Sequence, residues 1–250
     1  MFNGLALPLL VLLAMPCAVL ADALAGDSLT GDSLAGDALA VQDGEAFAFS
    51  WQVTQCGGTL RTEWRESGGK IVASDEVVFG SAGVQRYEIL RPGYGHDLQV
   101  QREARGFAIR TRTGQGREHA DFVAIDSRAV LAGPMLVTYA IDKLAELRAG
   151  AVLQIRYLIP ERAKVIVLQL RVVAAASGDR AEVEVRAASP WLRPFVPQTV
   201  MRFAADGRFV GMTGPLLPLG GPIESPASLH GELQARNRRV SSRCNILGLP

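Results

Sequence analysis

Alternation of apolar and polar residues with a period of two is the feature that most constrains this chain. It begins at residue 46, where Phe47, Phe49, Trp51 and Val53 alternate with small or polar residues. Successive side chains of a strand point to opposite faces, so such alternation between glycine-rich turns is typical of half-buried antiparallel strands. The pattern returns roughly every 8–12 residues as far as residue 125, which predicts a meander of strands.

One later segment has the spacing of a helix instead. Its apolar positions, three or four residues apart, are Leu136, Tyr139, Ala140, Leu144 and Leu147. Pro134 suits the first turn of a helix, and Gly150 suits the position just after its last turn. The spacing therefore predicts one amphipathic helix near 134–149, with these residues facing a sheet.

Strands are predicted again after this helix. The predicted segments are 151–159, 164–174, 181–187, 198–204 and 208–212. Asp206-Gly207, between the last two, is a strong hairpin signal. The expected fold is mainly β: an antiparallel open barrel or strongly curved sheet of about ten strands with one covering helix, over residues 45–213.

Residues 4–21 form an apolar run without a charged side chain. The run ends at Val19-Leu20-Ala21, which suits cleavage after Ala21, so residues 1–21 are predicted to be a secretory signal peptide. The alternative is a retained membrane anchor, although Pro8 and Pro16 interrupt a run shorter than the ~20 residues that a spanning helix needs. Either the periplasm or the extracellular medium is the expected location.

Two segments are predicted to lie outside the folded domain. Residues 22–44 contain the five-residue repeat LAGDS, LTGDS, LAGDA, whose composition is typical of a low-complexity acidic linker. Residues 214–250 contain Pro215, Pro218, Pro222 and Pro226 without a sustained period. We expect these residues to form a Pro-rich irregular tail.

Composition and motifs exclude several classes of function. With 26 Lys and Arg against 25 Asp and Glu, the chain is not a strongly basic nucleic-acid-binding protein. No zinc-ligand spacing occurs, and Gly114-Gln115-Gly116 lacks the third glycine and the helix of a nucleotide-binding loop, so no metal or cofactor is predicted. Gly26-Asp27-Ser28-Leu29 matches the GDSL esterases and lipases in four residues only, without the strand that holds a nucleophile, and predicts no catalytic residue.

Histidines and cysteines leave two questions open. His96 and His119 could belong to a hydrolase site assembled across strands, or they could lie on a solvated polar face, where His119 and Asp121 share one side of a strand. Cys56 and Cys244 remain after removal of the signal peptide. They either form one disulfide, as an oxidising compartment permits, or stay as two thiols.

The segment SPWLRPFVP at residues 189–197 combines three prolines with two large aromatic residues. A stiff loop of this kind could line or gate an apolar pocket, or it could plug one end of a barrel. The candidate ligand-lining residues are Trp51, Trp64, Tyr139, Leu144, Trp191 and Phe195.

The order of the predicted elements resembles that of a known family. LAELRAGAVLQIRYLIPERAKVIVLQLRVV leads through PWLRPFVP to MRFAADGRFV. Together with the preceding meander, over residues 46–213, this resembles exported bacterial proteins of unknown function and, in outline, the lipoprotein carriers LolA and LolB. The resemblance implies an open β-barrel in which a concave sheet and a helix enclose an apolar cavity for acyl chains. It is one of pattern, and no functional residue is carried over.

Three functions are compatible with these observations. The first is non-enzymatic binding of an apolar or lipid-like ligand in the cell envelope, and a deep apolar cavity would favour it. The alternative is a structural or interaction module that binds another envelope protein, which a solid interior would favour. The third is a hydrolase, which a Ser or Cys beside His96 or His119 would favour. The sequence favours a protein without enzymatic activity.

We predict that the mature chain begins at Asp22, because Val19-Leu20-Ala21 is the best cleavage site after the apolar run. N-terminal sequencing of exported material checks this. Recovery of an intact Met1 form in the membrane fraction would show a retained anchor instead.

Overall fold

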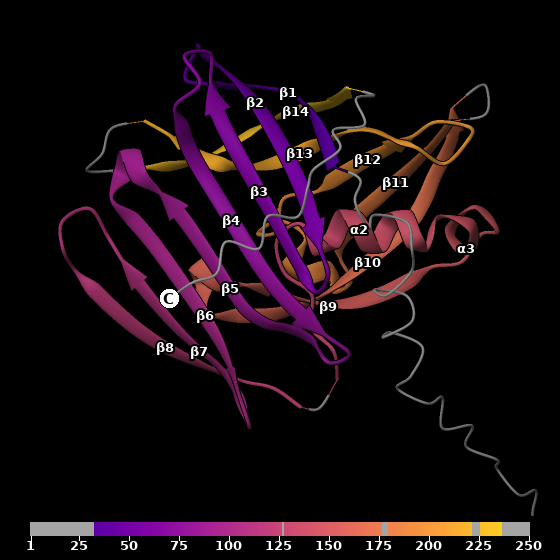
Figure 1. The fold of residues 1–250 in the computed structure, drawn as a ribbon. Coiled ribbons are helices and arrows are strands. Elements are labelled where there is room, and N and C mark those ends of the chain that lie inside the picture. Colours follow the sequence, from indigo (N-terminus) through magenta and orange to yellow (C-terminus); the bar gives the residue numbers. More distant parts are fainter. Residues whose placement is uncertain (1–32, 127, 177–179, 222–225, 237–250) are drawn as a thin grey trace, which may run out of the picture.

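Fourteen strands form one antiparallel sheet in the residues that the computed structural model describes, which are 33–126, 128–176, 180–221 and 226–236 (Figure 1). The strands of the first half are β1 (Ser33–Gln42), β2 (Glu45–Cys56), β3 (Thr59–Glu66), β4 (Ile71–Gly80), β5 (Gly83–Arg91), β6 (His96–Glu103), β7 (Gly106–Arg112) and β8 (Glu118–Ala124). The strands of the second half are β9 (Leu153–Ile159), β10 (Lys164–Ala176), β11 (Arg180–Ala187), β12 (Thr199–Phe203), β13 (Phe209–Gly220) and β14 (Ala227–Arg236).

The helical elements are short. Two α-helices, α2 (Met135–Asp142) and α3 (Leu144–Arg148), connect the two halves, and three 3-10 turns are η1 (Pro92–Tyr94), η2 (Pro160–Arg162) and η3 (Pro190–Leu192). In the part of the chain that is described, no helix has the length and apolar character needed to cross a membrane.

The sheet order is β8-β7-β6-β5-β4-β3-β2-β1-β14-β13-β12-β11-β10-β9. Each half is a meander, and the halves meet where β1 pairs with β14. In Figure 1 the sheet curls so that β2–β8 and β9–β12 form facing walls. The order ends at β8 and β9 without a pairing between them, so the barrel is open.

A short segment between β8 and α2 bridges the two halves. The Val84 amide donates to the Val130 carbonyl at 3.0 Å. On the other side, the Leu131 amide donates to the Arg156 carbonyl, and the Leu158 amide donates to the Leu131 carbonyl, both at 2.9 Å. We call Val130–Leu131 the strap. Both residues are buried, and the strap joins the start of β5 to β9.

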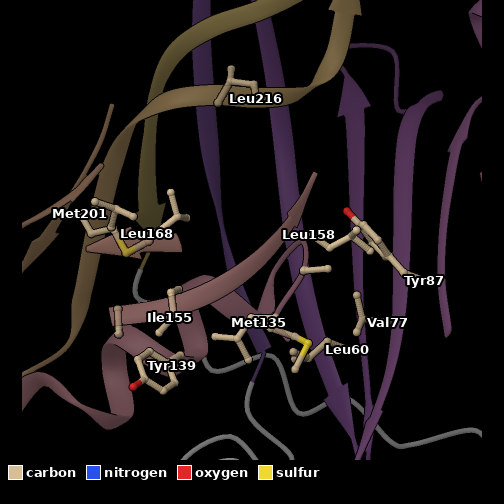
Figure 2. Packing of buried hydrophobic residues seen from close by; sticks show 14 of the residues in the cluster. Leu60, Val77, Tyr87, Met135, Tyr139, Ile155, Leu158, Leu168, Met201 and Leu216 are labelled. Atoms are coloured by element: carbon tan, nitrogen blue, oxygen red, sulfur yellow. The ribbon is translucent and has the colours of Figure 1, made fainter. Parts of the chain in front are cut away.

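Alternating side chains of both halves form the core. On β3 the inward residues are Leu60, Thr62 and Trp64, all buried, as the period of two predicts. Figure 2 shows Tyr87 and Leu158 opposite Leu168 and Met201, with side chains directed toward a common interior. Burial of one such large apolar side chain contributes roughly 1.5–3 kcal/mol.

The predicted helix near 134–149 is present as two segments that break at Lys143, whose φ of −89° and ψ of 7° end α2. The division of its faces is confirmed in large part. Tyr139, Ala140, Leu144 and Leu147 are buried, whereas Leu136 is half-buried.

The prediction of about ten strands is too low, and the first missed strand is β1. A linker was predicted over residues 22–44, but residues 33–42 pair with β2 and residues 35–40 also pair with β14; residues 22–32 lie outside the described residues. The small side chains that look like low complexity are needed for packing. A Cβ on Gly36 would lie 1.8 Å from the Gln234 carbonyl oxygen and 2.8 Å from Trp51 Nε1, so only glycine fits there.

The irregular tail predicted over residues 214–250 is also wrong as far as residue 236. β13 continues to Gly220, and β14 follows. Pro218 is accommodated because the register shifts between Pro215 and Leu219, where three residues of β13 lie opposite Leu229. A bulge removes the ladder bonds that proline cannot make. Residues 237–250 lie outside the described residues.

We predict that Gly83→Ala destabilises the fold far more than Gly44→Ala. Both glycines have positive φ, +82° and +84°, so alanine costs about 1–2 kcal/mol at either. At Gly83 the new Cβ would also lie 2.2 Å from the Val130 carbonyl oxygen, whereas nothing lies within 4 Å at Gly44. Urea unfolding followed by tryptophan fluorescence should show an additional loss of about 1–3 kcal/mol for Gly83→Ala. Equal losses would contradict a close strap contact.

Candidate functional site

A cavity of about 420 Å³ lies inside the barrel. Its wall is formed by both halves of the sheet together with α2, η2 and the loop before β12. Most of the lining is apolar, including Val53, Leu158, Leu168, Met201 and Leu233. The volume lies within the range of roughly 300–1,000 Å³ that is usual for small-molecule sites.

Two of the predicted lining residues form the centre of the β2–β3 wall. Trp51 and Trp64 lie directly opposite each other across these strands, and each is only 4% exposed. Trp51 meets Phe209 edge-to-face at 6.5 Å, and Trp64 meets Phe49 edge-to-face at 6.4 Å. Aromatic neighbours from other strands thus pack against both indoles in this part of the cavity wall.

The other four predicted lining residues separate into three groups. Phe195 lines the cavity, together with Val196 and Pro197. Tyr139 of α2 and Leu144 of α3 belong to the buried core and are not among the lining residues; α2 turns Leu136 and Val137 toward the cavity instead. Trp191 does not line the cavity and is 86% exposed.

The Pro-rich loop of residues 189–197 forms a rim of the cavity. Its Phe195 side chain is 66% exposed, so the loop does not plug the barrel end. Backbone bonds from Phe195 and Val196 to the Leu192 carbonyl fold it into consecutive turns. Arg162 Nη1 donates to the Phe195 carbonyl at 2.8 Å and fixes the loop to η2.

A buried carboxyl is the main polar feature of the wall. Asp75 is 5% exposed, and its Oδ2 accepts a hydrogen bond from the Tyr87 hydroxyl at 3.0 Å. By distance and angle no donor among the described residues pairs with its Oδ1: the Thr62 side chain, directly opposite across β3 and β4, is near enough to lower the carboxyl pKa but does not complete a hydrogen bond to this atom. Leaving a buried polar atom unpaired costs about 1–3 kcal/mol. Burial raises the pKa of Asp75 from 3.8 to about 6, against the opposing effects of Thr62, Tyr87 and Arg91.

A buried arginine joins several elements beside this carboxyl. Arg91 Nε donates to the Leu217 carbonyl in the β13 bulge at 3.0 Å, and Nη2 donates to Glu161 Oε1 at 2.9 Å. Nη1 lies 3.3 Å from His96 Nδ1. Burial and the Arg91 charge lower the pKa of His96. The guanidinium therefore connects β5, β6, η2 and β13 at one end of the cavity wall.

The remaining candidates lie away from the cavity lining. His119 Nε2 lies 3.0 Å from Asp121 Oδ2 on exposed β8, which confirms that these side chains share one face. Cys56 is exposed at the end of β2, whereas Cys244 lies outside the described residues, so their pairing stays a prediction. Among the described residues, no group of three or more His, Cys, Asp or Glu side chains is placed to hold a metal ion.

Sequence reasoning missed Asp75 and Arg91, although a signal for both exists. Asp75 occupies an inward position of β4 between buried Ala73 and Val77. Arg91 likewise follows Tyr87 and Ile89 on the inward face of β5. A charged residue at an inward position of an alternating strand has to be explained by a partner or a ligand.

Comparison with known proteins gives little guidance on function. No protein-family model matches the chain. No curated protein matches it either. Among solved structures, it is similar to a β-barrel-like protein of a domain of unknown function, DUF1849, from Brucella abortus, with a TM-score of 0.43 and 9% identity. That match covers 83% of this chain and 98% of the other.

We predict that the effect of Asp75→Asn on stability depends on pH. Because the folded-state pKa of about 6 lies above the ordinary 3.8, the folded state binds more protons between these values, and the stability of the natural chain falls as pH rises through this range. Urea unfolding should show that Asp75→Asn is better tolerated at pH 8 than at pH 4, by roughly 2–3 kcal/mol.

Asp97→Asn is the matched control, because Asp97 pairs with exposed Arg112 outside the cavity. Loss of the charge pair with Arg112 should not make Asp97→Asn better tolerated at pH 8 than at pH 4. An Asp75→Asn effect without better tolerance at pH 8 would contradict the assignment of a raised pKa.

Proposed function

We propose that this protein binds an apolar or lipid-like ligand in the cell envelope, without enzymatic activity. The observation that carries the proposal is the cavity of about 420 Å³, with its largely apolar wall. A ligand that enters such a cavity removes its apolar surface from water. The gain in free energy is of the same kind as the gain that drives apolar side chains into a core. The rim loop with Phe195 provides an apolar approach to it.

The cavity supports ligand binding over the two other functions. An interaction module has no need of an internal space, and a solid interior would have favoured it. The contacts of His96 and His119 are with Arg91 and Asp121, which suits a polar face better than a nucleophile and its base. The outline resemblance to the LolA and LolB carriers agrees with an acyl-chain ligand. The location outside the cytoplasm rests on residues 1–21, which lie outside the described residues.

Binding can be tested with N-phenyl-1-naphthylamine, an uncharged apolar dye whose fluorescence rises when it leaves water. The mature protein should enhance its fluorescence, and dodecanol should displace it. Val137→Trp places a larger side chain on the α2 part of the cavity wall and should weaken dye binding at least tenfold. Native mass spectrometry of exported protein should in addition detect a retained lipid.

Val152→Trp is the control, because Val152 is 52% exposed and is not a lining residue. It should bind the dye as the natural chain does. Absence of dye binding to the natural chain, together with no retained lipid, would overturn the proposed function. Dye binding that Val137→Trp leaves as tight as in the natural chain would show that the dye binds outside the cavity.

A further inference from the structure

Asp75 is one of four charged residues, with Arg91, Glu161 and Arg162, in the wall of a largely apolar cavity. It lies at an inward position of β4 and is 5% exposed. One carboxyl oxygen, Oδ2, is occupied by the Tyr87 hydroxyl, and the other, Oδ1, has no partner among the described residues. A buried carboxylate oxygen without a donor is costly to maintain. The interior therefore contains an acceptor that no donor of the described residues, the nearby Thr62 hydroxyl included, meets in hydrogen-bond geometry.

The backbone at Gly133 shows which of the two Asp75 carboxyl oxygens the protein encloses. Gly133, between the strap and α2, has a φ of +49° and packs against the Asp75–Tyr87 pair. A Cβ at this position would lie 2.8 Å from Asp75 Oδ2 and 2.6 Å from the Tyr87 hydroxyl. The protein thus encloses Oδ2 and its donor tightly, so Oδ1 is the atom left for another group.

Neighbouring cations do not supply that group. The Arg91 guanidinium donates to the Leu217 carbonyl and to Glu161, and it also contacts His96. Arg162 donates to the Phe195 carbonyl on the rim. Arg91 influences Asp75 through its charge alone. At pH 7.5, above its pKa of about 6, Asp75 is ionised, and its Oδ1 is a pure acceptor.

We propose that Asp75 Oδ1 binds the polar head of the ligand, and that the ligand is an amphiphile whose head donates a hydrogen bond, a hydroxyl or an ammonium group. This inference rests on the proposed function and specifies its ligand class. A buried carboxylate attracts a donor in low dielectric and repels a second carboxylate. The cavity should therefore discriminate against fatty-acid anions, although its walls suit their chains.

Three ligands with the same twelve-carbon chain test this at pH 7.5: dodecylamine, dodecanol and dodecanoate. Each displaces N-phenyl-1-naphthylamine from the mature chain. The natural protein should bind dodecylamine and dodecanol at least tenfold more tightly than dodecanoate. Asp75→Asn should weaken dodecylamine at least tenfold, strengthen dodecanoate severalfold, and change dodecanol little. The amide oxygen then accepts from Tyr87, and the amide NH2 group donates to a ligand hydroxyl or carboxylate but not to an ammonium group.

Asp97→Asn is again the control, since it removes a carboxylate outside the cavity, and it should leave all three affinities unchanged. The ranking in the natural protein tests the proposal without any variant, should Asp75→Asn fail to fold. Dodecanoate binding as tight as that of dodecylamine would overturn the head-group assignment and leave the proposed function intact. Failure of all three ligands and of the dye to bind would overturn both.

Discussion

The strap of Val130 and Leu131 is the constraint on which the barrel depends. A sheet whose ends, β8 and β9, do not pair would be free to unroll, and an exposed edge strand invites pairing with other chains. The strap gives β9 backbone partners on its open side and ties it to the start of β5. Its three backbone bonds lie in the buried interior, where each is costly to lose. The same segment leads into Gly133 and α2. The strap therefore fixes both the closure of the barrel and the position of the α2 part of the cavity wall.

The Arg91 side chain also links elements of the barrel that are distant in sequence. Its guanidinium reaches from β5 to the β13 bulge and to η2, so it holds together elements that are far apart in sequence. Arginine suits this role because its charge persists on burial and its donors point in several directions. The bulge is part of the same arrangement, since the Leu217 carbonyl lies in the region where β13 leaves regular pairing with β14. Prolines that would weaken an ordinary central strand are accommodated there.

Local sequence patterns predict most of the fold. They include the strands from β2 to β12, the hairpin at Asp206-Gly207 and the helical segment. β1 was missed, although Asp43-Gly44 carries the same hairpin signal, because the small residues of β1 produce no apolar alternation. β14 was missed because prolines precede it. Trp51 and Trp64 were recognisable as wall residues by size and alternation. The places of Tyr139 and Leu144 in the core depend on how α2 and α3 are rotated within the barrel, which the helical period alone does not give. The pairing of Asp75 with Tyr87 depends on the register between β4 and β5, which no local pattern reveals.

The position of β1 beside β14 has a consequence for how the protein is made. β1, the first described strand of the chain, pairs with β2 on one side. On its other side it pairs with β14, which ends only at Arg236. Contacts between such distant segments form late and slowly, because a long loop has to close before they contribute. Ala38 and Ala40 therefore cannot become fully buried before β14 has been synthesised. The two meanders can form in turn, but the complete sheet forms only after β14 has left the ribosome.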